Sequence, residues 1–307
     1  MAGHIWRRFL QAVLNLLVIV TIVFLMARAT GDLANTLVPE GASPEAVEAF
    51  RRQVGLGDPL YVQYVNFLSD LARGNLGISI KQQRPVTTIF KERMPATFSL
   101  ALVALLFALV FAVPLGVISA VYRDTLIDKF AKVMAFTGQS IPPFWLGLML
   151  IILFAVILNL LPAAGRGGVS SYVLPGLTLG WAISAGIVRL TRSSMLDVLD
   201  SDYITMARAK GLSEILVNGK HALRNALIPV ITFLGLVFGA FMNGSVVVEE
   251  VFAWPGIGRM AVSAVVGRDY PVVQGAVIIF GAFFIAINFI VDILYVLVDP
   301  RIRYARH

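Results

Sequence analysis

The hydrophobic positions of this chain form long apolar stretches, and shorter polar segments separate them. A helix needs about 20 mostly apolar residues to cross the roughly 30 Å hydrocarbon layer of a membrane. Lipid cannot satisfy exposed backbone N–H and C=O groups, so stretches of this length predict helices. The chain is therefore predicted to be an all-α membrane protein with six transmembrane helices. The six stretches are Phe9 to Ala27, about Ala96 to Tyr122, about Val133 to Leu161, Tyr172 to about Leu190, Ala226 to Val248, and Pro271 to Val291.

The composition also indicates a lipid environment. Hydrophobic residues make up 58% and charged residues 14% of the 307 positions, and the mean hydropathy is +0.83. Soluble domains have about 45–50% apolar and about 25% charged residues, so this chain has too little polar surface for a water-soluble fold. The net charge of +7 would suggest nucleic-acid binding in a soluble protein. Here the basic residues lie beside apolar stretches, as membrane orientation requires, and no nucleic-acid partner is expected.

The basic residues of the short loops predict the orientation. Cytoplasmic loops carry an excess of Lys and Arg, and alternation of the six predicted helices places most of these residues on one side. Both termini are therefore expected in the cytoplasm. Arg189 and Arg192, near the inner end of the fourth helix, are expected to extend toward the interface rather than to serve an intramembrane function. The cytoplasmic set is Arg7, Arg8, Arg123, Lys129, Lys132, Arg192, Arg208, Lys210, Lys220, Arg224, Arg301, Arg303 and Arg306.

This topology divides the chain into four parts. Residues 1–30 form a cytoplasmic N-terminus and the first helix, and residues 31–95 form a long external loop, in which Pro44 marks a predicted helix start. Residues 96–300 form the transmembrane core, with a cytoplasmic loop at 193–225. Residues 301–307 form a cytoplasmic tail.

Motifs for enzymatic chemistry are missing from the sequence. The chain has no cysteine, and its three histidines lie far apart, so no metal site is expected. Neither a phosphate-binding loop nor a G-x-S-x-G elbow occurs, so we expect no catalytic residue and no bound cofactor.

The most informative polar segment runs from Asp202 to Pro229. Ala207 and Ala209 alternate with the basic residues Arg208 and Lys210, and Gly211 follows as a helix stop. A short helix with small side chains permits close approach of a partner. A solvated loop helix explains the same composition equally well, and composition alone leaves both interpretations open.

This segment resembles the cytoplasmic loop of bacterial ABC importer permeases of the dipeptide, oligopeptide and nickel family. The resemblance lies in Thr205-Met206-Ala207-Arg208-Ala209-Lys210-Gly211 followed by His221-Ala222-Leu223-Arg224-Asn225-Ala226. Thr205 stands where the general pattern of this loop has an acidic residue. Three more segments resemble motifs of the family subunit with a long first external loop. They are Gly55-Leu56-Gly57-Asp58-Pro59-Leu60 with Gly74-Asn75-Leu76-Gly77, the run from Val248 to Gly258, and Arg268-Asp269-Tyr270-Pro271.

The resemblance implies the fold of a type I ABC importer permease in the bacterial inner membrane. It implies a heterodimer with a homologous permease subunit, two ATPase subunits that bind ATP and Mg, and an external solute-binding protein. Ala207 to Gly211 would form the coupling helix that sits in the ATPase groove, with Thr205 beside it. His221 is expected to pack against this loop, where its protonation would tune docking.

Glu249, Glu250 and Trp254 are candidates for an external gate. They follow the fifth predicted helix, where the carboxylates are positioned to meet a cationic amine of a substrate or a basic residue of the external loop. A solvated helix end is the alternative, and the two interpretations carry similar weight.

We therefore predict a permease subunit that imports peptides, with ATP hydrolysed by partner subunits. Nickel, glutathione and opine importers share the scaffold and stay as alternatives. An ion-coupled secondary transporter would show inverted repeats and unpaired acidic residues near the midplane, and the long uncharged stretches disfavour it. An intramembrane enzyme is disfavoured because nucleophile and metal patterns are lacking.

Overall fold

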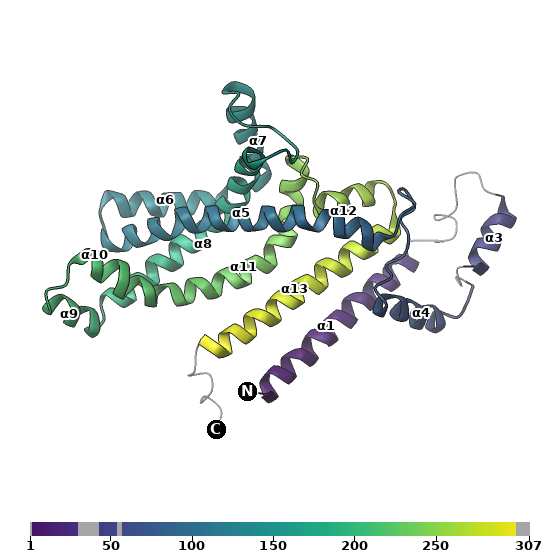
Figure 1. The fold of residues 1–307 in the computed structure, drawn as a ribbon, viewed down its shortest axis with the longest axis horizontal. Helices are drawn as coiled ribbons and strands as arrows, with labels where there is room; N and C mark the ends of the chain where they lie inside the picture. Colours follow the sequence, from purple (N-terminus) through teal and green to yellow (C-terminus); the bar gives the residue numbers. More distant parts are fainter. Residues whose placement is uncertain (1, 30–42, 54–56, 299–307) are drawn as a thin grey trace.

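The computed structural model describes residues 2–29, 43–53 and 57–298, and these form a bundle of helices (Figure 1). The expected tail 301–307 and part of the first loop lie outside the described residues. In the described part the β-structure is confined to an isolated bridge between Ile78 and Pro85. The elements are α1 (Ala2–Ala29), α3 (Pro44–Gln53), α4 (Leu60–Ala72), α5 (Val86–Val121), α6 (Leu126–Ser140), α7 (Pro143–Leu150), the π-helical η1 (Ile151–Ile157), the 3₁₀ turn η2 (Val169–Tyr172), α8 (Val173–Leu199), α9 (Asp202–Ala209), α10 (Glu214–Leu216), the π-helical η3 (Val217–Ala222), α11 (Leu223–Val251), α12 (Ile257–Val266) and α13 (Tyr270–Val298).

Several of these helices have the length and apolar character of membrane spans. Among the described residues, four helices meet both criteria, and a bent pair of helices makes a fifth if the pair crosses as one broken span. The four lie in α1, α5, α8 with η2, and α13. Helix α11 has 29 residues and covers the predicted fifth stretch. A mostly helical, multi-pass membrane protein is thus confirmed, while the number of six spans stays a prediction.

The third predicted stretch is not one helix. Helix α6 ends at Ser140, and the helix that starts at Pro143 leaves at an angle of 105°. Ile141 precedes Pro142 and has an extended backbone (φ −85°, ψ 120°), because a proline ring clashes with a helical residue before it. One continuous helix from Val133 to Leu161 is therefore ruled out, while a single broken span stays a prediction, and Figure 1 shows α7 projecting sideways from the bundle.

The observed helices extend beyond their apolar centres. Helix α5 begins at Val86, so the expected boundary between residues 95 and 96 falls inside this helix. Helix α8 continues to Leu199, into the predicted loop 193–225. The first or last turns of these helices are polar, so they extend past the hydrocarbon layer and are not part of an apolar stretch. This explains why the observed helices are longer than the predicted stretches. The predicted helix start at Pro44 is confirmed by α3.

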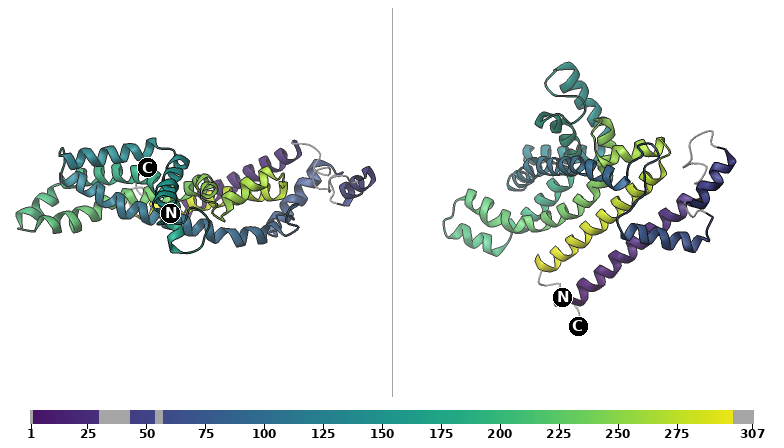
Figure 2. Two further views of the ribbon diagram at one scale, coloured as in Figure 1. Left: turned by 90° about the horizontal axis from the view of Figure 1, so that it is seen from above. Right: turned by 45° about the vertical axis from the view of Figure 1, so that its right-hand side comes forward.

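Helices α5, α8 and α11 form the centre of the bundle, and α1 lies beside α13 along one side (Figures 1 and 2). Small buried residues line the contact of α5 with α8. A side chain added at Gly180 would lie 2.6 Å from the carbonyl oxygen of Ala104, so the two backbones can approach this closely only with glycine there. The stripe on α5 recurs about every fourth residue and consists of Ala96, Ala104, Ala108, Ala112, Gly116 and Ala120.

The bundle has two ends that matter for function. Helix α9 lies at one end, where α5 and α8 terminate and α11 begins; we call this the α9 end (Figure 1). The opposite end holds α12, the start of α5 and the turn before α13; we call this the α12 end.

Candidate functional site

Helix α9 is a short helix at the surface of the α9 end. It begins at Asp202 and stops at Ala209, and Gly211 follows with φ +78°, a left-handed conformation that glycine adopts without strain. The predicted short helix with a glycine stop is confirmed. Its bounds differ from the prediction, since Lys210 and Gly211 lie just beyond the helix.

The two sides of α9 differ in burial. Ile204 and Ala207 face inward and pack in a cluster with Met195, Val217 and Ala222. The opposite side is exposed and carries Thr205, Met206, Arg208 and Ala209, with Lys210 and Gly211 at its end. The small side chain of Ala207 thus serves contacts within this chain, while Ala209 lies on the accessible side. The predicted role of Ala207 to Gly211 as the coupling helix stays a prediction.

Polar contacts hold α9 against the segment that follows it. Asn225 donates a hydrogen bond from Nδ2 to the Tyr203 hydroxyl at 2.8 Å, which links the start of α11 to α9. Arg208 pairs with Glu214 through Nε at 2.8 Å. His221 is half-buried in η3, and its carbonyl oxygen accepts a hydrogen bond from Asn225 Nδ2 at 3.3 Å. Asn225 was not among the predicted site residues, although it lies within the motif that follows His221.

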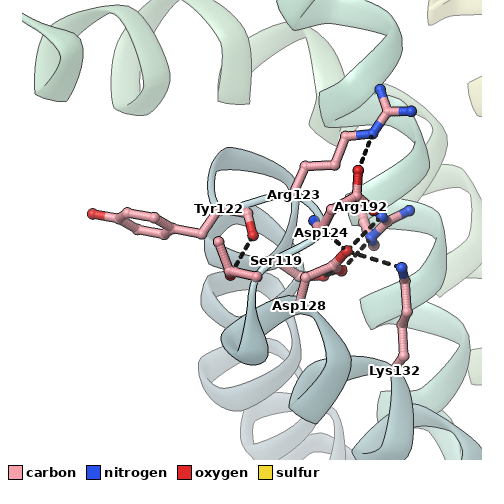
Figure 3. A network of polar contacts seen from close by, with 8 residues as sticks. Ser119, Tyr122, Arg123, Asp124, Asp128, Lys132 and Arg192 are labelled. Atoms are coloured by element: carbon pink, nitrogen blue, oxygen red, sulfur yellow. Dashed lines mark hydrogen bonds and ion pairs between the residues drawn. The ribbon is translucent and has the colours of Figure 1, made fainter.

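A buried ion-pair network lies next to α9, at the turn between α5 and α6 (Figure 3). Asp128 is fully buried, and Arg192 of α8 reaches its two carboxylate oxygens at 2.8 and 2.9 Å. Lys132 lies 2.9 Å from the same carboxylate, and Ser119 donates to it at 2.6 Å. Arg192 therefore pairs with Asp128 at the α5–α6 turn, a partner that the sequence did not indicate, and its extension toward the membrane interface stays a prediction. Arg189 donates to Gln139 Oε1 at 3.1 Å.

At the α12 end, Glu249 is fully buried and caps α12. Its carboxylate accepts hydrogen bonds from Thr97 Oγ1 at 2.7 Å and from the Arg259 backbone N–H at 3.0 Å. Thr97 Oγ1 also accepts from the Ile257 N–H at 2.9 Å. The first N–H groups of a helix lack partners within the helix, so Glu249 and Thr97 satisfy them and place a negative charge at the positive end of α12.

Trp254 is also fully buried, beside Ala96 of α5 and Tyr172, the residue before α8. Its indole Nε1 donates to the Ala96 carbonyl at 2.9 Å, and its ring packs edge-to-face on Tyr172 with centroids 4.6 Å apart. Glu250 is exposed. A solvated helix end is thus wrong for Glu249 and Trp254, and among the three predicted gate residues only Glu250 faces outward in this structure.

The Gly74–Gly77 part of the first external motif and the Arg268–Pro271 motif come together at the α12 end. The buried carboxylate of Asp269 accepts hydrogen bonds from the Ser79 hydroxyl and from the Ile80 and Lys81 backbone N–H groups, the latter two at 3.1 and 3.3 Å. Gly77 approaches Pro271 closely enough for an added Cβ to lie 3.7 Å from its ring. Motifs far apart in sequence therefore build one surface.

A pocket of about 350 Å³ opens on this surface beside Asp269. Three basic residues line it, namely Lys81, Arg93 and Arg259, together with Ser263 and Gln82. Lys81 and Arg93 have no carboxylate within ion-pair distance in the described part of the chain, so the pocket presents positive charge. Nowhere in the described residues do three His, Cys, Asp or Glu side chains lie together as a metal site would require.

The long apolar helices, the closely packed bundle and the surface helix α9 define a multi-pass membrane permease. The family model "Binding-protein-dependent transport system inner membrane component" matches residues 112–304, and the model of the N-terminal part of such components matches residues 1–101. The chain belongs to this family, the permeases of ABC importers, and the predicted family relationship is confirmed.

Curated relatives match along the whole chain. The chain is 42% identical over 305 residues to the glutathione transport system permease protein GsiC of Escherichia coli O6:H1 strain CFT073, with 99% of this chain and 100% of the relative covered. The proteins of that name from Escherichia coli K12 and Salmonella typhimurium LT2 are each 41% identical with the same coverage. Among solved structures, the inward-facing MetNI methionine ABC transporter superposes with a TM-score of 0.59 at 18% identity, covering 69% of this chain and 96% of that chain. This last similarity shows the fold.

Proposed function

We propose that this permease carries glutathione or a closely related short peptide across the bacterial inner membrane. The observation that carries the proposal is the full-length identity of 41–42% to permeases named for glutathione transport. The permease would form a heterodimer with a homologous subunit, and both termini would lie in the cytoplasm. Six passes would follow if α6 with α7 and η1 makes one broken span and α11 makes another.

Helix α9 is the proposed contact for the ATPase subunits. The face that carries Thr205, Arg208 and Ala209 is exposed, and the side chain of Ala209 on it is small. Such a face fits a groove in a partner, because small side chains permit close approach. ATP and Mg would be bound by the two ATPase subunits, and the energy of their closure would reach the bundle through α9.

The α12 end is the proposed docking face for the solute-binding protein. The pocket lined by Lys81, Arg93 and Arg259 offers positive charge at the position where such a protein would deliver its solute. Acidic side chains on the solute-binding protein are the matching chemistry, since complementary charges steer docking and fix register. Exposed Glu250 is the gate residue that stays available for a cationic amine of the substrate.

Reconstitution of the complete complex in lipid tests the proposal. Uptake of labelled glutathione should require ATP and the solute-binding protein, and unlabelled dipeptides, an opine or nickel chelates should compete poorly. Stronger uptake of one of these solutes would reassign the substrate within the family. Uptake that persists without the ATPase subunits and follows an ion gradient would indicate a secondary transporter instead.

Two variants on α9 test the ATPase contact. Ala209→Glu places bulk and charge on the exposed side and should abolish co-purification of the ATPase subunits while membrane insertion survives. Ala207→Glu places the same group in the buried cluster and should destabilise the α9 end itself. Full ATPase association in Ala209→Glu would show that α9 is only a solvated connector.

A further inference from the structure

We propose that the Asp128–Arg192 ion pair is the joint that makes the α5–α6 hairpin move together with α8 and α9, so that closure of the ATPase subunits opens the transport path. The inference rests on the proposed function and adds to it the residues that transmit the motion.

Asp128 joins three helices through one carboxylate. Ser119 donates from the last turns of α5, Lys132 from α6, and Arg192 from α8. The Asp124 backbone N–H, in the α5–α6 turn, donates to the same carboxylate at 3.0 Å. Figure 3 shows these groups converging on Asp128. A rotation of α8 relative to the hairpin would therefore break both charge-assisted bonds from Arg192, while the other contacts keep Asp128 fixed within the hairpin.

The carboxylate of the network is buried in the bundle, and its two cationic partners reach the surface. The side chain of Asp128 is 0% exposed, while those of Arg192 and Lys132 are 20% and 50% exposed. Arg192 is held by two parallel N–H···O bonds, which fix the direction of the guanidinium as well as its distance. An apolar contact lacks this directional constraint and allows sliding.

The joint lies directly beside α9. Arg192 precedes the end of α8 by about two helical turns. Met195, one turn further along, packs in one buried cluster with Ile204 and Ala207 of α9 and with Ala120, the residue after Ser119. A displacement of α9 thus reaches α8 and the end of α5 at the level of the ion pair.

Close packing of α5 against α8 beside the ion pair restricts sliding of the two helices past each other. A Cβ added at Gly116 of α5 would lie 2.7 Å from the Thr191 Cβ and 2.9 Å from the Val188 carbonyl oxygen of α8. The two helices are in close contact at Gly116, about one turn before Ser119 in α5. A shift of α8 along its axis therefore moves α5 with it as long as the ion pair is intact. Coupling through packed, discrete contacts of this kind is the physical requirement for transmission.

Transport per ATP hydrolysed is the readout that separates a joint from a purely structural ion pair. Arg192→Lys keeps the positive charge but cannot form the two parallel hydrogen bonds to the carboxylate. Asp128→Asn removes the negative charge. In the reconstituted complex both variants should assemble and hydrolyse ATP, while solute moved per ATP falls about two- to thirtyfold, the range expected for mutations along a coupling network. Arg123→Gln is the matched control, because this arginine pairs with exposed Asp124 at 3.4 Å on the rim of the network, and it should keep the ratio. An unchanged ratio in assembled Arg192→Lys and Asp128→Asn complexes would overturn the inference.

Spin labels provide a second measurement that does not depend on transport. The chain has no cysteine, so labels can be placed on Lys129→Cys in α6 and Asp197→Cys in α8, both exposed. The distance between them should stay constant through the ATP cycle with Arg192 present, and should change or broaden in Arg192→Lys. A distance that varies equally in both proteins would refute a rigid joint.

If the unaltered complex shows no ATP-driven uptake at all, the proposed function fails and the inference fails with it. Normal uptake with an unchanged ratio of solute to ATP in the variants rejects the inference alone.

Discussion

Thr97 Oγ1 in α5 lies 2.7 Å from the Glu249 carboxylate at the end of α11, although 152 positions separate the two residues. The same carboxylate accepts from the Arg259 N–H, so one buried side chain ties α5, α11 and the start of α12 together. The α12 end therefore behaves as one unit, and its integrity depends on this single acceptor.

Replacing this acceptor should destabilise the α12 end. Glu249→Gln puts an amide with two donors opposite backbone N–H donors, and loss of a charged acceptor in a buried network costs about 1–3 kcal/mol of unfolding free energy. Thermal unfolding of the purified protein in detergent measures the change. The neighbour Glu250→Gln is the control and should stay within about 0.5 kcal/mol, because its side chain is exposed. Equal stability of both variants would contradict the capping role of Glu249.

The Asp269 carboxylate should keep the loop at Ser79–Lys81 closed against the α12–α13 turn. Asp269→Asn weakens charge-assisted hydrogen bonds worth about 1.5–3 kcal/mol, so the loop should open more often by about tenfold or more. The rate of tryptic cleavage after Lys81 in nanodiscs reports this opening. Asp58→Asn, at an exposed position outside the turn, should leave the rate unchanged. If Asp269→Asn is cleaved after Lys81 no faster than the unaltered protein, other contacts keep the loop closed.

Arg208 should matter more for ATPase binding than for the fold. Its ion pair with Glu214 is exposed, with 42% and 60% of the side chains accessible, and exposed pairs contribute about 0–1 kcal/mol. Arg208→Ala should therefore unfold normally but lower ATPase affinity about tenfold, or ~1.4 kcal/mol. Glu214→Ala removes the same ion pair but keeps the positive charge of Arg208. This variant should retain its affinity for the ATPase subunits. Equal losses in the two variants would assign the effect to the ion pair.

Charge reversal in the basic pocket should weaken docking of the solute-binding protein. Arg93→Glu should raise the concentration of that protein needed for half-maximal ATPase stimulation about three- to tenfold at low salt. The difference should shrink toward 1 M salt, where the screening length is about 3 Å. Lys91→Glu is the matched control, because Lys91 is exposed on the same turn of α5 and does not line the pocket. If both reversals act alike, net charge of the surface is responsible and the pocket is not.

The sequence by itself determined the membrane class and the approximate places of five long helices. Apolar length, proline and glycine act locally, so the stretches in α1, α5, α8, α11 and α13 and the stop at Gly211 are visible without a structure. The motifs from Thr205 to Gly211 and from Val248 to Gly258 were sufficient to indicate the family. The break at Pro142 and its angle of 105° were not predicted.

Only the tertiary structure decided which polar groups meet. Asp128 and Arg192 are 64 positions apart, and Ser79 and Asp269 are 190 apart. Their pairing depends on how α5, α8 and the α12–α13 turn pack, which local preferences do not specify. For the same reason the sequence left the inward side of α9 undetermined, because a short helix shows its buried face only when its neighbours are in place. Burial in a bundle is a property of several helices together, and a buried charge is stable only where their packing brings a partner within reach.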